Sequence, residues 1–479
     1  MTVYQGGAVS QLPEATAVVL AAGRGTRMRS GVPKVLHRAG GRPLVAHVLD
    51  SLRRLELSGG LVAVVSAGGR VQRELAESGD DVDFVVQDPP AGTADAVRIA
   101  LERLGDYPGR LLVAQGATPL ITTETFRALL EAHVARGARA TVLTAVRADP
   151  FGYGRILRDA EGELVGIVEE RDATEEERLL TEVNSGAYVF DASGLAGVWD
   201  ALDSGNDQGE YYLPDVIGLL RSKGEALATY TTTAEEVFGV KSRSHLAWVE
   251  SVLRRRACER WMAEGVTIVD PATTYIDASA VLAKDAVVRP FTFLEGRTVV
   301  GEGAEVGPQA RIVDSEVGPG AHVSFAVVVG SSIGPEASVG PFASLRAGTR
   351  LERRAKVGSF VEAKQSRIGE GGKVPHLAYV GDADIGSGVN VGAGTITANW
   401  DGRSKHPTVI EDDAYIGSNT VLVAPSRVGR RAATGAGAVV RGDVPDDALA
   451  VGVPARIIAG KGNRMASPRN ESESPGAST

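Results

Sequence analysis

The chain of 479 residues is poor in cysteine, with Cys258 as its single thiol, and poor in aromatic residues, which make up 5%. One cysteine excludes a disulfide within the chain and is typical of a reducing compartment, so we expect a cytoplasmic location. Positive charge is also scarce, because 51 Lys and Arg stand against 60 Asp and Glu, for a formal net charge of −9. The phosphates of nucleic acids and of anionic membranes would be repelled, so neither is an expected partner.

Long hydrophobic runs are lacking at both ends of the chain. The start, MTVYQGGAVSQLPEATAVVLAAG, has no basic segment and its apolar run is only as long as a strand. It predicts neither a secretion signal nor a membrane-spanning helix. Residues 462–479 (GNRMASPRNESESPGAST) are polar and poor in apolar side chains, which predicts a disordered tail.

Short apolar runs alternate with amphipathic stretches from residue 15 to about residue 240. TAVVLAAG, LVAVVSAG, DFVVQ and RLLVAQG have the pattern of buried strands, whereas LVAHVLDSLRRL and TADAVRIALERL have the apolar spacing of helices. Strands that alternate with helices predict an α/β domain with a doubly wound sheet. One long helix is predicted from Ser244 to about Glu264, with its arginines on a solvated face.

A different periodicity begins after Gly265, where an aliphatic residue recurs every six positions. A period of six fits neither a helix nor an ordinary strand, and it is typical of one flat side of a parallel β-helix. The chain from residue 265 is therefore predicted to form a parallel β-helix of hexapeptide repeats. The repeat is carried by Val300, Val306, Ile312, Ile333, Val339, Leu345, Leu351, Val357, Ile410, Ile416, Leu422, Val428 and Val440, with Thr434 in one place.

The six-residue period slips between Gly381 and Ile410, where VNVGAGTITANWDGRSKHPTVI is longer than one coil needs. Insertions in a solenoid project as loops, commonly on the binding face. This loop carries Asn399, Trp400 and Lys405.

Two segments carry candidate chemistry. The loop LAAGRGTRMRSGVPK follows the first predicted strand, and its glycines with Arg24, Arg27 and Lys34 predict a phosphate-binding site rather than a plain turn. His376 lies in the repeat region near Lys364 and Tyr379. A lone histidine is usually structural, but stacked coils can bring a base, an acid and a phosphate-binding cation together, so both interpretations stay open.

The stretch VAQGATPL ends a predicted buried strand, at a place where α/β sheets collect ligands. A phosphate-handling enzyme is expected to keep a carboxylate there for its metal ion, and this chain has Ala117.

The motifs as a set resemble the bacterial family of bifunctional N-acetylglucosamine-1-phosphate uridyltransferases and glucosamine-1-phosphate acetyltransferases. The resemblance covers nearly the whole chain, through LAAGRGTRM, PKVLH, GYGRI, VEERDAT, NSGAYVF and GEYY, and then PFASLRAG, GSFVEAK, HLAYVGDADIGSGVNVGAGTITANWDG and YIGSNTVLVAP. It implies an α/β doubly wound nucleotidyltransferase domain over residues 1–241, a linker helix over 242–264, an acetyltransferase domain over 265–461 and a tail over 462–479. The acetyltransferase domain is implied to be a left-handed parallel β-helix of hexapeptide repeats. It also implies a homotrimer that supplies precursors of peptidoglycan and other cell-wall polymers.

For the second half, the resemblance implies acetyl transfer from acetyl-CoA to glucosamine-1-phosphate, with acetyl-CoA lying between neighbouring subunits. His376 would accept a proton from the sugar amine and Glu362 would orient the imidazole. Arg346 and Lys364 would hold the sugar phosphate, with Tyr379 and Asn390 on the sugar. The implied acetyl-CoA residues are Ala393, Asn399, Trp400, Lys405, Ser418 and Ala436, with Trp400 where the family usually has tyrosine.

For the first half, the resemblance implies attack by N-acetylglucosamine-1-phosphate on the α-phosphorus of UTP, with release of pyrophosphate. Arg27 and Lys34 would contact the phosphates. The other implied residues are Leu20, Ala21, Ala22 and Gly23 on the nucleotide, Gln87, Gly92 and Thr93 on uracil, and Gly154, Glu169 and Asn184 on the sugar.

The Mg²⁺ ligands of the family are an aspartate in G-D-x-P-L and an asparagine in G-V-N-x-R. These positions are Ala117 in GATPL and Lys241 in GVKSR, so no metal ligand is predicted in this chain. Asp88-Pro89-Pro90 and Pro214 also depart from the family's usual sequence. Three hypotheses stay open: an acetyltransferase whose first domain only binds ligands or supports the fold, a fully bifunctional enzyme, and an enzyme with a different sugar or nucleotide.

Overall fold

The computed structural model describes residues 13–23, 25–77, 82–195, 197–206 and 209–461. The chain divides into two compact units, Met1–Leu253 and Arg254–Thr479. Arg24 and the predicted disordered tail lie outside the described residues. In the described part, no helix combines the length and the apolar character that a membrane crossing needs.

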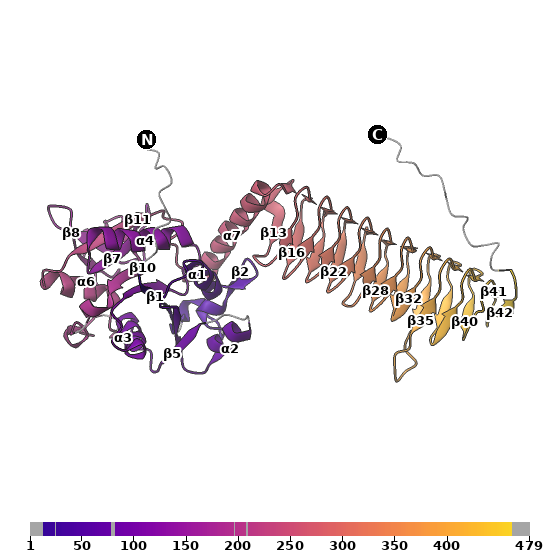
Figure 1. The fold of residues 1–479 in the computed structure, drawn as a ribbon, viewed down its shortest axis with the longest axis horizontal. Helices are drawn as coiled ribbons and strands as arrows, with labels where there is room; N and C mark the ends of the chain where they lie inside the picture. Colours follow the sequence, from indigo (N-terminus) through magenta and orange to yellow (C-terminus); the bar gives the residue numbers. More distant parts are fainter. Residues whose placement is uncertain (1–12, 24, 78–81, 196, 207–208, 462–479) are drawn as a thin grey trace. The chain divides into compact units, whose positions relative to one another are not determined.

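The first unit is built on one mixed sheet, with β6 in the middle of the strand order and β1 beside it (Figure 1). β1 pairs in parallel with β4 on one side and with β6 on the other, and β10 runs antiparallel between β6 and β7. The strand order is β11 (Leu227–Thr232), β7 (Ala140–Val146), β10 (Glu182–Asp191), β6 (Arg110–Gln115), β1 (Ala15–Ala21), β4 (Leu61–Ser66) and β5 (Asp83–Gln87), with β8 (Arg155–Arg158) and β9 (Leu164–Val168) attached through β10.

Helices cover both faces of this sheet because successive strand residues point to opposite sides. Val19 of β1 lies in one core with α1 (Leu44–Arg53), α2 (Arg70–Glu77) and α4 (Thr123–Arg136). Val18, its neighbour, lies in the other core with α3 (Thr93–Leu104) and α6 (Leu213–Ser222). The predicted doubly wound α/β architecture is confirmed, and so are the predicted strands and helices.

One detail of the prediction was wrong. DFVVQ forms β5, but this is the edge strand of the sheet, and Val86 is 46% exposed. An edge strand has a neighbour on one side only, so a continuous apolar run does not guarantee burial on both faces.

The long helix predicted from Ser244 to about Glu264 is α7 (Arg243–Ala263). Arg255 and Glu259 form an ion pair one turn apart, and both side chains are more than half exposed. The interpretation of the arginines as a solvated face therefore holds for this pair.

The second unit is a stack of coils in which short consecutive strands visit three parallel sheets in turn (Figure 1). The first sheet holds β24 (Ser338–Val339), β27 (Lys356–Ser359), β30 (Lys373–His376), β33 (Asn390–Val391), β36 (Tyr415–Ile416) and β39 (Ala433–Thr434). The second holds β25 (Ala343–Leu345), β28 (Glu362–Lys364), β31 (Tyr379–Gly381), β34 (Ile396–Ala398), β37 (Val421–Val423) and β40 (Val439–Arg441). The third holds β26 (Arg350–Leu351), β29 (Arg367–Ile368), β32 (Ala383–Ile385), β35 (Thr408–Ile410) and β38 (Ser426–Val428).

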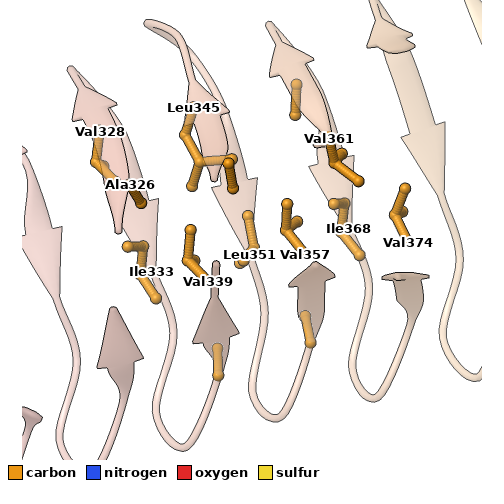
Figure 2. Packing of buried hydrophobic residues seen from close by; sticks show 14 of the residues in the cluster. Ala326, Val328, Ile333, Val339, Leu345, Leu351, Val357, Val361, Ile368 and Val374 are labelled. Carbon is orange, nitrogen blue, oxygen red and sulfur yellow. The ribbon is translucent and has the colours of Figure 1, made fainter. Parts of the chain in front are cut away.

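The six-residue repeat fills the inside of this stack. In Figure 2, Ile333, Val339, Leu345, Leu351 and Val357 point into the interior from successive strands, and each is at most 3% exposed. Aliphatic side chains from successive strands stack on one another inside the coils, so the parallel β-helix predicted from the repeat is confirmed. The inserted segment between β34 and β35 projects as a loop, as predicted, and is closed by a bridge between Trp400 and Lys405.

Candidate active sites

The glycine-rich loop after β1 brings two basic side chains to one place. A Cβ atom on Gly25, which has φ +60°, would lie 2.5 Å from the Cβ of Lys34. Only glycine permits this approach, so the loop folds back onto the short helix at Lys34–Leu36. Arg27, in the short helix Thr26–Met28, and Lys34 then line the same two cavities.

The first cavity, of about 480 Å³, lies beyond the carboxyl end of β1. The residues that the resemblance places around the nucleotide gather here, with one exception. Ala21 belongs to the hydrophobic core on the opposite face of the sheet and lines neither cavity. The lining includes Leu20, Ala22, Gly23, Arg27, Lys34, Gln87, Gly92 and Thr93.

Hydrogen bonds fix the part of this cavity that is implied for the base. The buried Gln87 amide donates to the Gly92 carbonyl over 3.0 Å and to the Asp95 carboxylate over 2.8 Å. Thr93 accepts a 3.0 Å hydrogen bond from the backbone N–H of Leu213. Gly92 has φ +119°, and a Cβ atom there would lie 2.4 Å from the carbonyl oxygen of Tyr211, so no other residue fits.

The second cavity, of about 230 Å³, adjoins the first and gathers Gly154, Glu169 and Asn184, the three residues implied for the sugar. The Asn184 amide donates to the Tyr188 hydroxyl over 2.7 Å, which holds the amide plane in place. Burial raises the pKa of the Glu169 carboxyl, while the Lys241 ammonium opposes this shift. Pro214, which departs from the family's usual sequence, also lines this cavity.

Ala117 and Lys241 lie together where the two cavities meet. The backbone N–H of Val240 donates to the Ala117 carbonyl over 2.9 Å, so the segment after β11 crosses the end of β6. Ala117 and Lys241 line both cavities, as do Arg27 and Lys34. The two positions that the resemblance implies for Mg²⁺ ligands are thus neighbours in this structure.

The Lys241 ammonium is held at this junction by its surroundings. It donates a hydrogen bond to the Gly152 carbonyl and lies 3.7 Å from the centroid of the Tyr153 ring. Desolvation, followed by the charge of Arg27, lowers the pKa of Lys241 to about 8, while Glu169 opposes the shift. Burial likewise lowers the pKa of Lys34.

These residues do not fit a magnesium ion. Mg²⁺ takes oxygen ligands, whereas Ala117 offers a methyl group and Lys241 a positive charge. Among the described residues, no group of three or more His, Cys, Asp or Glu side chains could hold a metal.

In the second unit, the residues implied for acetyl transfer lie on adjacent coils. Tyr379 of β31 stacks in register on Glu362 of β28, and His376 at the end of β30 stacks on Ser359. Because β27 leads into β28 and β30 into β31, His376 and Glu362 lie at the same corner, one coil apart. His376 is exposed in the single chain.

Two ionic contacts surround this corner. The Arg346 guanidinium donates to the Glu362 carboxylate over 3.0 Å, with both side chains substantially exposed. Lys364 lies near Lys405 of the projecting loop, and hydrogen bonding with Lys364, followed by its positive charge, lowers the pKa of Lys405. Two neighbouring lysine side chains form a place where an anion is electrostatically favoured.

The projecting loop joins this arrangement through Asn399. The Asn399 amide donates to the Asp382 carboxylate and, over 3.5 Å, to the Tyr379 hydroxyl. Trp400 is 58% exposed. Asn390, on β33, stacks on Lys373 rather than in the column of Tyr379.

The other residues implied for acetyl-CoA continue the corner of His376 along the stack. The Asn419 N–H donates to the Ala393 carbonyl over 2.7 Å, and the Gly437 N–H donates to the Ser418 carbonyl over 2.8 Å. Ala436, beside Gly437, belongs to the same series of turns between the first and second sheets. The structure therefore brings Ala393, Ser418 and Ala436 onto one edge.

Sequence reasoning missed several lining residues. Tyr153 lies under Lys241 and its hydroxyl accepts a 3.3 Å hydrogen bond from the Gly239 N–H. It stands inside GYGRI, but nothing in that motif indicates its partners. Gln115, which lines both cavities, and Asp382, which accepts from Asn399, were missed in the same way.

Comparison with known proteins places this architecture in a class. A family model described as a MobA-like NTP transferase domain matches residues 17–182. The chain is 48% identical over 437 residues to the bifunctional protein GlmU of Heliobacterium modesticaldum, covering 91% of this chain and 95% of the relative. It is 46% identical to that of Carboxydothermus hydrogenoformans, covering 91% and 96%, and 44% identical to that of Shouchella clausii, covering 91% and 95%.

The fold and its cavities therefore define a nucleotidyltransferase domain followed by a parallel β-helix of hexapeptide-repeat type. These relatives match over almost their whole length, and the resemblance implied by the motifs is confirmed. The chain belongs to the GlmU family of bifunctional proteins.

Proposed function

We propose that the second unit transfers an acetyl group from acetyl-CoA to the amine of glucosamine-1-phosphate. The observation that carries this proposal is that Tyr379 stacks on Glu362 while His376 lies at the same corner, beside the cations Lys364 and Arg346. The pattern supplies a base, a carboxylate to orient it and positive charge for a phosphate.

In this proposal, His376 accepts the proton of the sugar amine as the nitrogen attacks the thioester carbonyl. The carbon–sulfur bond then breaks and the CoA sulfur leaves as a thiolate that takes up a proton. General base catalysis of this kind typically contributes about 10²–10⁴-fold to the rate. The cations of Lys364 and Lys405 favour the sugar phosphate or the CoA phosphates electrostatically.

We also propose that the β-helix forms a homotrimer through the edge that carries His376. Phe291, Phe342 and Phe360 occupy that corner on earlier coils, and Leu377 follows His376 directly. All four side chains are more than half exposed and have positive φ angles. Phe342 and Phe360 stack with ring centroids 5.4 Å apart. Exposed aromatic rings along one edge are costly in water, and because this edge leads to the proposed site of acetyl transfer, a second copy of the same chain is the partner that fits.

The acetyl transfer proposal is tested with purified full-length protein, acetyl-CoA and glucosamine-1-phosphate, by following the released thiol. His376→Ala should lower kcat by about 10²-fold or more while the oligomeric state is unchanged. His322→Ala is the matched control, because His322 is exposed on the same sheet at an earlier coil. Full activity of the His376 variant would show that another group is the base.

For the first unit, we propose binding of uridine nucleotide and N-acetylglucosamine-1-phosphate in the two adjoining cavities, with magnesium-dependent uridylyl transfer weak or lost. The cavities support binding, while Ala117 and Lys241 do not fit the metal. Pyrophosphate release from UTP, N-acetylglucosamine-1-phosphate and Mg²⁺ tests this. Robust turnover by the unchanged protein would favour the fully bifunctional alternative, and no turnover with other sugar phosphates or nucleotides would exclude a changed substrate.

The double variant Ala117→Asp with Lys241→Asn restores the oxygen ligands implied by the family. If loss of the metal ligands is the defect, this variant should release pyrophosphate much faster than the unchanged protein. The proposed setting of both reactions is the cytoplasmic supply of UDP-N-acetylglucosamine for cell-wall synthesis.

A further inference from the structure

Three cations meet where the two cavities of the first unit join. Arg27, Lys34 and Lys241 line both cavities. Among the described residues, no carboxylate forms an ion pair with any of them, and Glu169 acts on Lys241 only from a longer distance. Gathering like charges in a half-buried place costs free energy, so this cluster has the character of an anion site.

The position of Lys241 is fixed by contacts that serve no evident purpose in packing. Its ammonium is drawn to the junction by the Gly152 carbonyl and the face of the Tyr153 ring. The segment that carries it is anchored by the hydrogen bond from Val240 to Ala117. A lysine at the mouth of a cavity normally extends into water, but this side chain is held between the two compartments.

Geometry and charge indicate which part of a ligand lies there. The first cavity is proposed to hold the nucleoside of a nucleotide sugar, and the second cavity its sugar. The part of such a ligand that spans the junction of the two cavities is the diphosphate that links the nucleoside to the sugar. A lysine ammonium has three N–H donors, of which one is used by Gly152. The remaining donors can contact phosphate oxygens, which is the neutralising and orienting role that a divalent cation would otherwise supply.

We propose that Lys241, together with Arg27 and Lys34, binds the diphosphate of a nucleotide sugar directly, so that ligand binding by this unit needs no divalent cation. The inference rests on the proposed nucleotide and sugar binding of the first unit. It assigns Lys241 a binding role that Ala117 makes possible, because an aspartate at that position would pair with the ammonium and compete with the phosphates.

The test is isothermal titration of the full chain with UDP-N-acetylglucosamine, in EDTA and in Mg²⁺. The unchanged protein should bind in EDTA at least as tightly as in Mg²⁺. Lys241→Met, which keeps the aliphatic stem over Tyr153 but removes the charge, should weaken binding in EDTA by about 10-fold or more. Lys223→Met is the matched control, because Lys223 is exposed at the end of α6 and lines neither cavity.

A second variant separates the charge from the fold. Ala117→Asp with Lys241→Asn should bind poorly in EDTA and regain affinity when Mg²⁺ is added, which reverses the metal dependence of the unchanged protein. Far-ultraviolet circular dichroism confirms that each variant is folded.

Two results would overturn the inference in different ways. Binding by the unchanged protein only with Mg²⁺, or undiminished binding by Lys241→Met in EDTA, would refute the role of Lys241 and leave nucleotide binding intact. Absence of binding in both buffers would refute the proposed nucleotide site itself, and the inference with it.

Discussion

Removing the charge of Lys241 should stabilise the first unit of the fold. The ammonium is desolvated and lies near Arg27 and Lys34, which is why its pKa falls from 10.5 to about 8. A shift of one pKa unit corresponds to about 1.4 kcal/mol, so the charged form costs the folded state about 3 kcal/mol at neutral pH. Lys241→Met should recover up to that amount.

The stability gained by Lys241→Met should depend on pH. A lysine whose pKa is lowered by folding destabilises the folded state below about pH 8, and the penalty disappears as the pH rises towards the unfolded pKa near 10.5. The advantage of Lys241→Met should therefore be largest near about pH 7 and vanish near about pH 10.

The assay is calorimetry of the full chain, with the transition of the first unit assigned by hydrogen exchange of amides in β1 and β6. A gain of about 3 kcal/mol corresponds to a rise in Tm of roughly 6–12 °C for a unit of this size. Lys223→Met controls for the loss of a lysine. A lower Tm for Lys241→Met near about pH 7, or a gain that persists near about pH 10, would refute the electrostatic reasoning.

Three further predictions concern both units. Phe360→Asp places a charge among the exposed aromatic rings of the proposed interface and should dissociate the proposed trimer. Sedimentation velocity would then show a smaller species, and an unchanged sedimentation coefficient would count against this edge as the interface. Leu345→Ala removes a fully buried side chain from the inside of the β-helix and should lower the free energy of unfolding, measured by urea titration, by about 2–5 kcal/mol. A loss below about 1 kcal/mol would mean that the surrounding coils close the cavity left by the substitution. In EDTA, affinity for UDP-N-acetylglucosamine should fall as the pH rises through about 8, because Lys241 loses its proton there. Isothermal titrations at several pH values would measure this fall. An affinity that does not change with pH would mean that another cation carries the binding.

The parts of the structure that could be predicted are those set by periodicity. The six-residue repeat leaves one arrangement in which Leu345 and its counterparts are all buried, and the alternation of strands with helices leaves a doubly wound sheet. Burial of β5 could not be predicted in the same way, because Val86 is exposed by the position of its strand at the sheet edge and not by its own chemistry.

In the candidate sites, too, local features could be predicted from the sequence, whereas contacts between distant segments could not. The sequence by itself determined the two domain types, and it predicts a phosphate-binding loop and a catalytic imidazole at His376, because each depends on residue identity or local spacing. The replacement of two oxygen ligands is a prediction that rests on the family resemblance. Only the tertiary structure decided that Ala117 and Lys241 are neighbours, that Tyr153 and Gly152 hold the ammonium between the cavities, and that Lys364 meets Lys405. These contacts join segments far apart in the chain, and how such segments meet depends on the packing of whole elements, which no local pattern encodes.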